Sequence, residues 1–212
     1  MATENLPKKI AIFPLPGAIF FPKTTLPLNI FEKRYIKMVS DCMKEHRFFG
    51  MIQPKFKNSL KTEIYKIGCL GKIVSFNETN DNRFLIVLSG ITRFKIKEEI
   101  QTNKLYREFC VDYTDFENDL LPENNATEES ERKLLTKKIK KFFERKNYLI
   151  EFNELKKLDF NQMLNTICMI APFSIEEKQK LIETIKMEDK IKVLENIIDF
   201  HLIDNFKNQT IQ

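Results

Sequence analysis

The 212-residue sequence has no tryptophan, two histidines, five glycines and eight prolines. So little glycine and proline excludes collagen-like and low-complexity chains. No stretch approaches the roughly 18 consecutive apolar residues that a membrane-spanning helix requires. The first ten residues, MATENLPKKI, lack the basic start and apolar run of a secretory signal peptide. The sequence therefore predicts a globular cytoplasmic protein that does not act on membranes.

Cysteine is also scarce, and its spacing argues against a metal site. Cys42, Cys69, Cys110 and Cys168 are 27, 41 and 58 residues apart and form no Cys-x-x-Cys pair. A structural metal site usually draws two of its ligands from positions close in sequence. We therefore expect reduced and mostly buried thiols, with no metal and no cofactor.

Motifs that would indicate catalysis are missing. His46 and His201 do not neighbour a serine or cysteine in a recognisable nucleophile motif. The nearest approach to a phosphate-binding loop is GKI at 71–73, but Lys66 stands where the first glycine belongs and Ile73 cannot ligate magnesium. The sequence predicts a protein without catalytic residues.

The positive charge is confined to the first part of the chain. Residues 1–122 hold 19 basic and 14 acidic residues, which gives +5, whereas residues 123–212 hold 16 of each. Nucleic-acid-binding modules usually concentrate far more positive charge. The segment 132–146 has eight basic residues in fifteen on a predicted amphipathic helix. We interpret it as a solvated face over a bundle core, and the alternatives are a helix that faces a membrane surface, a calmodulin-like partner or RNA.

The first half of the chain is predicted to be mostly β-structure. Short apolar or alternating runs at 9–15, 24–30, 48–54, 67–76, 83–89, 92–100 and 106–116 predict strands, with one early helix between the second and third. Pro27 suggests an edge strand or a bulge. FLIVL (84–88) predicts a strand buried on both faces, and NETNDN (77–82) predicts a hairpin. These short, mostly sequential strands predict a small antiparallel barrel or folded sheet.

The second half is predicted to be helical. A polar stretch around Pro122 marks a boundary, so we expect subdomains at 8–118 and 126–206. Ser174 and Glu177 form a capping box. Apolar residues at helical spacing predict four helices, and the class is therefore α+β. These apolar positions are Leu135, Ile139, Phe142 and Phe143; Phe160, Met163, Leu164, Ile167 and Cys168; Leu181, Ile182 and Ile185; and Ile191, Leu194, Ile198 and Leu202.

Several of these stretches occur in the order known from one family. The segments IFPLPGAIFFPKTTLPLNIFEKRYIKMV, GMIQP, YKIGCLGKIVSF, NRFLIVLSGITRFKI and PFSIEEKQKLIE resemble the N-terminal substrate-recognition domain of the Lon protease family over roughly residues 8–190. The resemblance implies a PUA-like β pseudo-barrel followed by a helical bundle. It also implies recognition of exposed apolar segments in unfolded or client polypeptides.

The sequence departs from the family pattern in two ways. Asn29 and Lys33 stand where relatives have His and Pro, while Asn82 and Ser89 replace a glycine and an acid. The motifs of the family's ATPase and protease modules are also missing. The resemblance therefore implies a free-standing, non-catalytic domain that could act as an adaptor for a separate ATP-dependent protease.

PLNIFEKRY (27–35) joins a predicted strand to the early helix and raises two alternatives. Asn29 and Glu32 have the spacing of a helix N-cap and its N3 acid. Phe31 and Tyr35 fall on the apolar face of the helix, so the core explains them. Arg34, beside Met38 at the rim of that face, is left without a structural role. The cluster is thus either a structural junction or an edge that contacts a polypeptide.

PLPGAIFFP (14–22) contributes the other candidates. Phe20 and Phe21 are adjacent, so in a strand they point to opposite faces. One should lie in the core, and the other either under a loop or in an exposed patch that meets a partner. The candidate polypeptide-binding residues are Phe20, Phe21, Phe31, Arg34, Tyr35 and Met38. An RNA-binding module of PUA-like fold stays open as the alternative, although RFKIK (93–97) is the nearest approach to a basic and aromatic RNA-binding strand.

Overall fold

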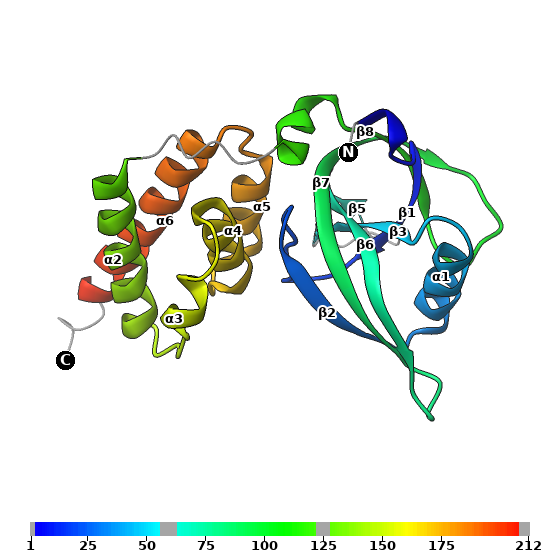
Figure 1. The fold of residues 1–212 in the computed structure, drawn as a ribbon, viewed down its shortest axis with the longest axis horizontal. Helices are drawn as coiled ribbons and strands as arrows, with labels where there is room; N and C mark the ends of the chain where they lie inside the picture. Colours follow the sequence, from blue (N-terminus) through cyan, green and yellow to red (C-terminus); the bar gives the residue numbers. More distant parts are fainter. Residues whose placement is uncertain (1–2, 56–62, 122–127, 208–212) are drawn as a thin grey trace. The chain divides into compact units, whose positions relative to one another are not determined.

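The computed structural model describes residues 3–55, 63–121 and 128–207 (Figure 1). The chain divides into two compact units, residues 1–121 and 122–212, and each is treated by itself below. We refer to them as the β unit and the helical unit. Residues 122–127, within the predicted boundary, lie outside the described residues. Within the described part of the chain, no helix is long and apolar enough to cross a membrane.

The β unit is built around one sheet that closes on itself. Its strands are β1 (Lys9–Pro14), β2 (Thr25–Ile30), β3 (Phe48–Ile52), β6 (Ile67–Glu78), β7 (Phe84–Ile100) and β8 (Glu108–Asp112), in the order β2-β7-β6-β3-β1-β8. A further pairing of β7 with β8 closes the barrel and leaves β2 as an attached edge strand. The remaining elements are η1 (Thr3–Asn5), α1 (Lys33–Lys44), the two-residue strands β4 (Pro54–Lys55) and β5 (Glu63–Ile64), and η2 (Thr114–Leu120).

The expected fold class is confirmed, with one difference in the barrel. Among the described residues, every strand pair is antiparallel except β1 with β3, which run parallel. Parallel neighbours need a long connection, and the chain between β1 and β3 contains β2 and α1. Pro27 lies on β2, so its predicted edge position is confirmed. The predicted hairpin is confirmed as well, because residues 79–83 join β6 to β7.

Strand β7 differs from the prediction in two respects. The strands predicted at 83–89 and 92–100 form one strand of 17 residues, with the register irregular at Gly90. The double burial predicted for FLIVL is wrong, because Phe84, Ile86 and Leu88 face the core while Leu85 is exposed. Pairing with β2 and β6 occupies both edges of this strand but leaves one face outside the barrel, so its burial alternates.

The segment between β1 and β2 is packed closely against β7. Gly90 donates its N–H to the carbonyl of Thr24, and the N–H of Lys23 donates to Gly90, each at 2.9 Å. Phe20 and Phe21 are both fully buried beneath this contact. Of the two alternatives for the second phenylalanine, this excludes the exposed patch that meets a partner. Residues 15–24 form no strand, so the alternation of faces does not apply to them.

Helix α1 begins later than the sequence predicts. Its N-cap is Glu32, which makes no side-chain capping bond, and Asn29 belongs to β2. The predicted Asn29–Glu32 capping pair is therefore wrong. Phe31 precedes the helix and is 64% exposed, so its predicted place in the core is also wrong. Tyr35, Met38, Val39 and Cys42 form the buried face of α1.

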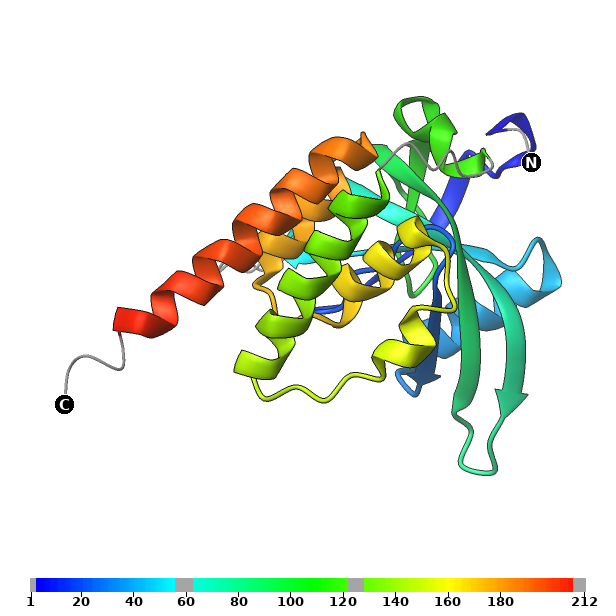
Figure 2. The ribbon, with the colours of Figure 1, turned by 60° about the vertical axis from the view of Figure 1, so that its left-hand side comes forward.

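Residues 128–207 of the helical unit form five helices rather than the four expected. They are α2 (Glu129–Arg145), α3 (Phe152–Leu155), α4 (Phe160–Ile170), α5 (Ile175–Glu183) and α6 (Met187–Lys207). Helix α2 packs against α6, drawn in red in Figure 2. The apolar residues predicted for α2 and α4 are all buried. Ile185 is exposed, contrary to expectation, because α5 ends at Glu183.

The capping box of α5 is present as predicted, and it gives a stability test. Ser174 Oγ accepts from the N–H of Glu177 at 3.1 Å, and the Glu177 carboxylate accepts from the N–H of Ser174 at 2.7 Å. We expect Ser174→Ala to lower the unfolding free energy of the helical unit by about 1 kcal/mol, because a backbone donor loses its partner. Denaturant titration would measure this, with the exposed Ser130→Ala as control. Equal losses in the two variants would contradict the prediction.

Candidate functional site

One cavity of the β unit, of about 430 Å³, brings together residues that are far apart in sequence. We name it the Tyr35 pocket. Its walls come from the end of β1 and the residues after it, from the start of α1, from Pro54 of β4, and from the connection between β7 and β8. Its lining residues are Ile12, Phe13, Pro14, Leu15, Pro16, Glu32, Arg34, Tyr35, Pro54, Leu105, Tyr106 and Arg107.

The pocket opens where β1 loses its neighbour on one side. The pairing of β1 with β8 ends at Ala11, and the last bond runs from the N–H of Ile12 to the carbonyl of Arg107 at 3.0 Å. Successive residues of a strand direct their N–H groups to alternate sides. The next N–H on the Ile12 side would belong to Pro14, and proline has none. The chain can therefore leave β1 here without a backbone N–H group that lacks an acceptor.

Tyr35 forms the aromatic floor of the pocket. Its ring meets that of Phe13 edge to face, with centroids 4.4 Å apart, and the guanidinium of Arg34 lies 4.5 Å from its centroid. Both Nε and Nη2 of Arg34 approach Glu32 Oε2, at 2.9 and 2.8 Å. Burial raises the pKa of Tyr35, with smaller opposing effects from the nearby charges. The hydroxyl is therefore protonated at neutral pH and can donate a hydrogen bond.

The opposite wall comes from residues 101–107, which connect β7 to β8. Leu105 is 67% exposed and presents an apolar side chain to the pocket. Arg107 forms a two-pronged ion pair with Glu99, from Nε to Oε1 at 2.8 Å and from Nη2 to Oε2 at 2.9 Å. Its guanidinium also lies 4.9 Å from the centroid of Phe109. These contacts fix the direction in which residues 105–107 lead into β8.

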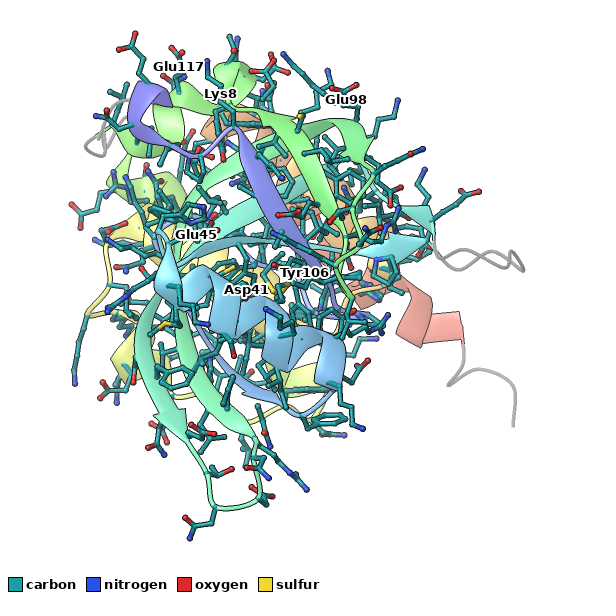
Figure 3. All side chains as sticks on the ribbon, turned by 90° about the vertical axis from the view of Figure 1, so that its right-hand side faces the viewer. Lys8, Asp41, Glu45, Glu98, Tyr106 and Glu117 are labelled. Carbon is teal, nitrogen blue, oxygen red and sulfur yellow. The ribbon has the colours of Figure 1, made fainter. Side chains whose placement is uncertain are left out.

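A second set of polar contacts ties this connection to α1. The hydroxyl of Tyr106 donates to Asp41 Oδ2 at 2.9 Å, and Figure 3 shows the two side chains meeting between the connection and α1. Lys37 binds the other oxygen of Asp41, and this hydrogen bond is the main cause that lowers the pKa of Asp41. Burial, followed by the bond to Asp41, raises the pKa of Tyr106 to about 12. The two walls of the pocket are therefore held together before any ligand binds.

The same connection is held on the barrel side by an ion pair. Lys104 Nζ lies 2.9 Å from Glu108 Oε1, and Lys9 Nζ lies 3.4 Å from Glu108 Oε2. Glu108 is buried, so pairing with two lysines offsets the cost of removing its charge from water.

The structure places only two of the six predicted binding residues in the pocket, Arg34 and Tyr35. Phe20, Phe21 and Met38 are buried in the core, which removes them from any surface that a polypeptide could reach, so these three assignments are corrected. Phe31 is exposed but does not line the pocket.

Sequence reasoning missed the contribution of Leu105, Tyr106 and Arg107. The sequence pattern predicts a strand over YREFCVDYTDF (106–116), whereas β8 begins only at Glu108. The available signal is Leu105, an apolar residue that directly follows the polar stretch QTNK (101–104).

The cysteines and histidines form no reactive centre in the described residues. All four cysteines are free thiols, and Cys42, Cys69 and Cys168 are buried as expected. Burial raises the pKa of Cys42 and of Cys168 to about 12, so both are thiols at neutral pH. His201 Nε2 pairs with Glu177 at 3.0 Å. No group of three His, Cys, Asp or Glu residues that could hold a metal ion occurs in the described ranges.

Comparison with protein families identifies the following match. Residues 9–199 match the family described as the ATP-dependent protease La (LON) substrate-binding domain. The chain is 19% identical over 206 residues to a Lon protease of Anaeromyxobacter dehalogenans and 21% identical over 199 residues to a Lon protease of Dictyoglomus thermophilum. These alignments cover 92% and 90% of the chain but 24% of each relative. The chain thus spans about a quarter of the length of these relatives.

Solved structures show the same fold. A Lon N-terminal domain protein from Xanthomonas campestris superposes with a TM-score of 0.61 at 19% identity, covering 90% of this chain and 97% of that one. The N-terminal domain of a Lon protease of the Mycobacterium avium complex gives a TM-score of 0.60 at 13% identity, covering 91% and 98%.

Proposed function

The chain belongs to the family of Lon substrate-binding domains, and from this membership we propose that it is a non-catalytic module that binds exposed apolar segments of unfolded or client polypeptides. The match extends over most of the chain and over both compact units. Substrate recognition is the role that the family's description names. The apolar segment as ligand, and the place where it binds, are our proposals.

The Tyr35 pocket is the observation that supports this proposal. Its volume of about 430 Å³ falls within the range usual for ligand sites. Phe13, Pro14, Leu15 and Leu105 supply apolar walls, and Arg34 is a charged residue beside them. Apolar contact surrounded by polar groups resembles the core and rim of a protein interface, and it can accept many sequences.

The fate of a bound polypeptide is a second part of the proposal. The relatives are Lon proteases of about four times this length. We propose that this chain contributes only the recognition step and presents bound clients, as an adaptor, to a separate ATP-dependent protease.

The pocket is tested by placing a charge on its exposed apolar wall. We expect Leu105→Asp to weaken binding of a fluorescently labelled unfolded protein about tenfold or more, because a buried contact is replaced by a carboxylate that must lose water. Thermal stability should change little, since Leu105 is mostly exposed in the free protein. Fluorescence anisotropy and thermal unfolding would be measured on the same samples.

Leu121→Asp is the matched control, because Leu121 is also an exposed leucine of the β unit and does not line the pocket. It should bind like the unaltered protein. Equal binding by all three proteins would place the site elsewhere. Binding of a labelled RNA that falls steeply with salt would indicate phosphate contacts and would favour the RNA-binding alternative.

A further inference from the structure

Strand β2 leaves one of its two edges open. It pairs with β7 from Thr25 opposite Ser89 to Ile30 opposite Phe84. Among the described residues, no strand pairs with its other edge. An unpaired strand edge presents a row of backbone N–H and C=O groups, which is a template for another extended chain.

A contact at the start of β2 shows which backbone groups face the open edge. The carbonyl of Thr24 accepts from the N–H of Gly90, so it is directed to β7. Because successive residues of a strand direct these groups to alternate edges, the odd-numbered residues face the open edge. They are Thr25, Pro27 and Asn29, and all three are exposed. Their three carbonyls and the N–H groups of Thr25 and Asn29 have no hydrogen-bond partner within the described part of the chain.

The apolar face of β2 is also incompletely covered at this edge. The side chains of Leu26 and Leu28 lie on the same face as those of Leu88 and Ile86, their partners on β7. Leu88 and Ile86 are 0% and 2% exposed, whereas Leu26 and Leu28 are only partly buried. Side chains on one face of a sheet pack against those of the neighbouring strands. A strand added at the open edge would therefore bury both leucines further.

Pro27 decides which kind of strand fits the open edge. A symmetric pairing of two copies of β2, centred on Pro27, would place proline opposite proline and lose two hydrogen bonds in the middle of the pair. Any other centre shortens the overlap, because β2 has only six residues. A different chain without proline loses one hydrogen bond only. Residues 25–30 carry no charge, so an uncharged segment matches them best.

We infer that the open edge of β2 binds an extended segment of a client polypeptide as an additional strand. The client donates backbone N–H groups to the carbonyls of Thr25, Pro27 and Asn29, and its own carbonyls accept from Thr25 and Asn29. Alternate apolar side chains of the client cover Leu26 and Leu28. The inference rests on the proposed function and adds to the Tyr35 pocket a second contact, which recognises the backbone and therefore accepts many sequences.

The test removes one donor of the open edge and leaves the pairing with β7 intact. Asn29→Pro deletes an N–H that is directed away from β7, in a strand that already contains a proline. The probe is a fluorescein-labelled ten-residue peptide of alternating valine and threonine with both ends blocked. We expect Asn29→Pro to weaken its binding about fivefold in fluorescence anisotropy, the effect of one lost hydrogen bond. Asn29→Ala, which keeps the N–H and removes the side chain, is the matched control and should bind like the unaltered chain.

Pro27→Val tests the same edge with the opposite sign. It supplies the missing donor, so the peptide should bind about fivefold more tightly. Thermal unfolding would be measured for every variant, and this result does not depend on whether Asn29→Pro folds. A second peptide has the same side chains but is N-methylated at its four central residues, which removes their donors. We expect it to bind the unaltered chain at least tenfold more weakly.

Equal binding of the two peptides, or equal affinity of Pro27→Val and the unaltered chain, would overturn the inference. A dimer in sedimentation that Asn29→Pro abolishes would assign the edge to a second copy of the chain and would overturn it as well. The proposed function would still stand if unfolded protein binds in a manner that depends on Leu105. It would fall with the inference if neither unfolded protein nor peptide binds.

Discussion

Replacing Asp119 with alanine is expected to lower the unfolding free energy of the β unit by about 3–5 kcal/mol, because it leaves a buried arginine without its counter-charge. The side chain of Arg93 is only 3% exposed and that of Asp119 is 10% exposed. Nη2 and Nε of Arg93 donate to the two carboxylate oxygens at 2.7 and 2.9 Å, and the N–H of Arg93 donates to the same group at 2.9 Å.

The Arg93–Asp119 pair also attaches η2 to the barrel. The guanidinium of Arg93 lies 4.7 Å from the ring centroid of Phe116, and Thr92 Oγ1 donates to the carbonyl of Phe116 at 3.3 Å. Removing the Asp119 carboxylate should therefore loosen η2 and also take the ion-pair partner away from Arg93. Denaturant unfolding would measure the loss in free energy, and hydrogen exchange of residues 114–120 would show the loosening.

Asp115→Ala is the matched control within the same element. Asp115 is half exposed and pairs with Lys95 at 3.7 Å, also at the surface. Exposed pairs of this kind contribute between zero and about 1 kcal/mol. If Asp119→Ala lowers the unfolding free energy no more than Asp115→Ala does, the buried Arg93–Asp119 pair does not hold the end of the barrel together.

The second large effect is expected at Gly90, where Gly90→Ala should cost about 3 kcal/mol or more. A Cβ atom there would lie 2.0 Å from the carbonyl oxygen of Phe21 and 2.9 Å from its carbonyl carbon. Overpacking against movable side chains typically costs about 1–3 kcal/mol. Here the obstacle is backbone, and two hydrogen bonds of Gly90, with Lys23 and Thr24, fix that backbone in place.

Gly17→Ala separates this collision from the general cost of replacing a glycine. Gly17 has φ of +72°, but an added Cβ would meet nothing within 4 Å. Its substitution should cost only the strain of the left-handed conformation, about 1–2 kcal/mol. Chemical denaturation of both variants would compare them. A smaller loss at Gly90 than at Gly17 would mean that the segment carrying Phe20 and Phe21 can move away from β7.

Where function is concerned, the sequence reached only part of the site. It identified Arg34 as a residue that neither a cap nor the core requires, and the structure places it at the pocket beside Tyr35. It could not pair these residues with Leu105, about 70 positions later in the chain. That juxtaposition depends on the closure of β7 onto β8 and on the bond between Tyr106 and Asp41.

The sequence by itself determined the features that depend on neighbours along the chain. The capping box at Ser174 and the apolar faces of α2 and α4 involve residues three or four positions apart, and the β6–β7 hairpin involves a short polar connection. Local periodicity and local hydrogen bonding fix these features wherever the segment lies in the molecule. The α+β class follows from the same local signals, because strand-type and helix-type periods occur in separate halves of the chain.

Only the tertiary structure decided features that depend on contacts between distant segments. Asn29 has the local chemistry of a helix cap, but pairing of β2 with β7 continues to Ile30 opposite Phe84 and holds Asn29 in the strand. Phe20 and Phe21 are both buried because Gly90, about 70 residues later, admits their backbone against β7. In each case the free energy of a long-range contact exceeds a local preference of about 1 kcal/mol. The sequence pattern shows only the local preference.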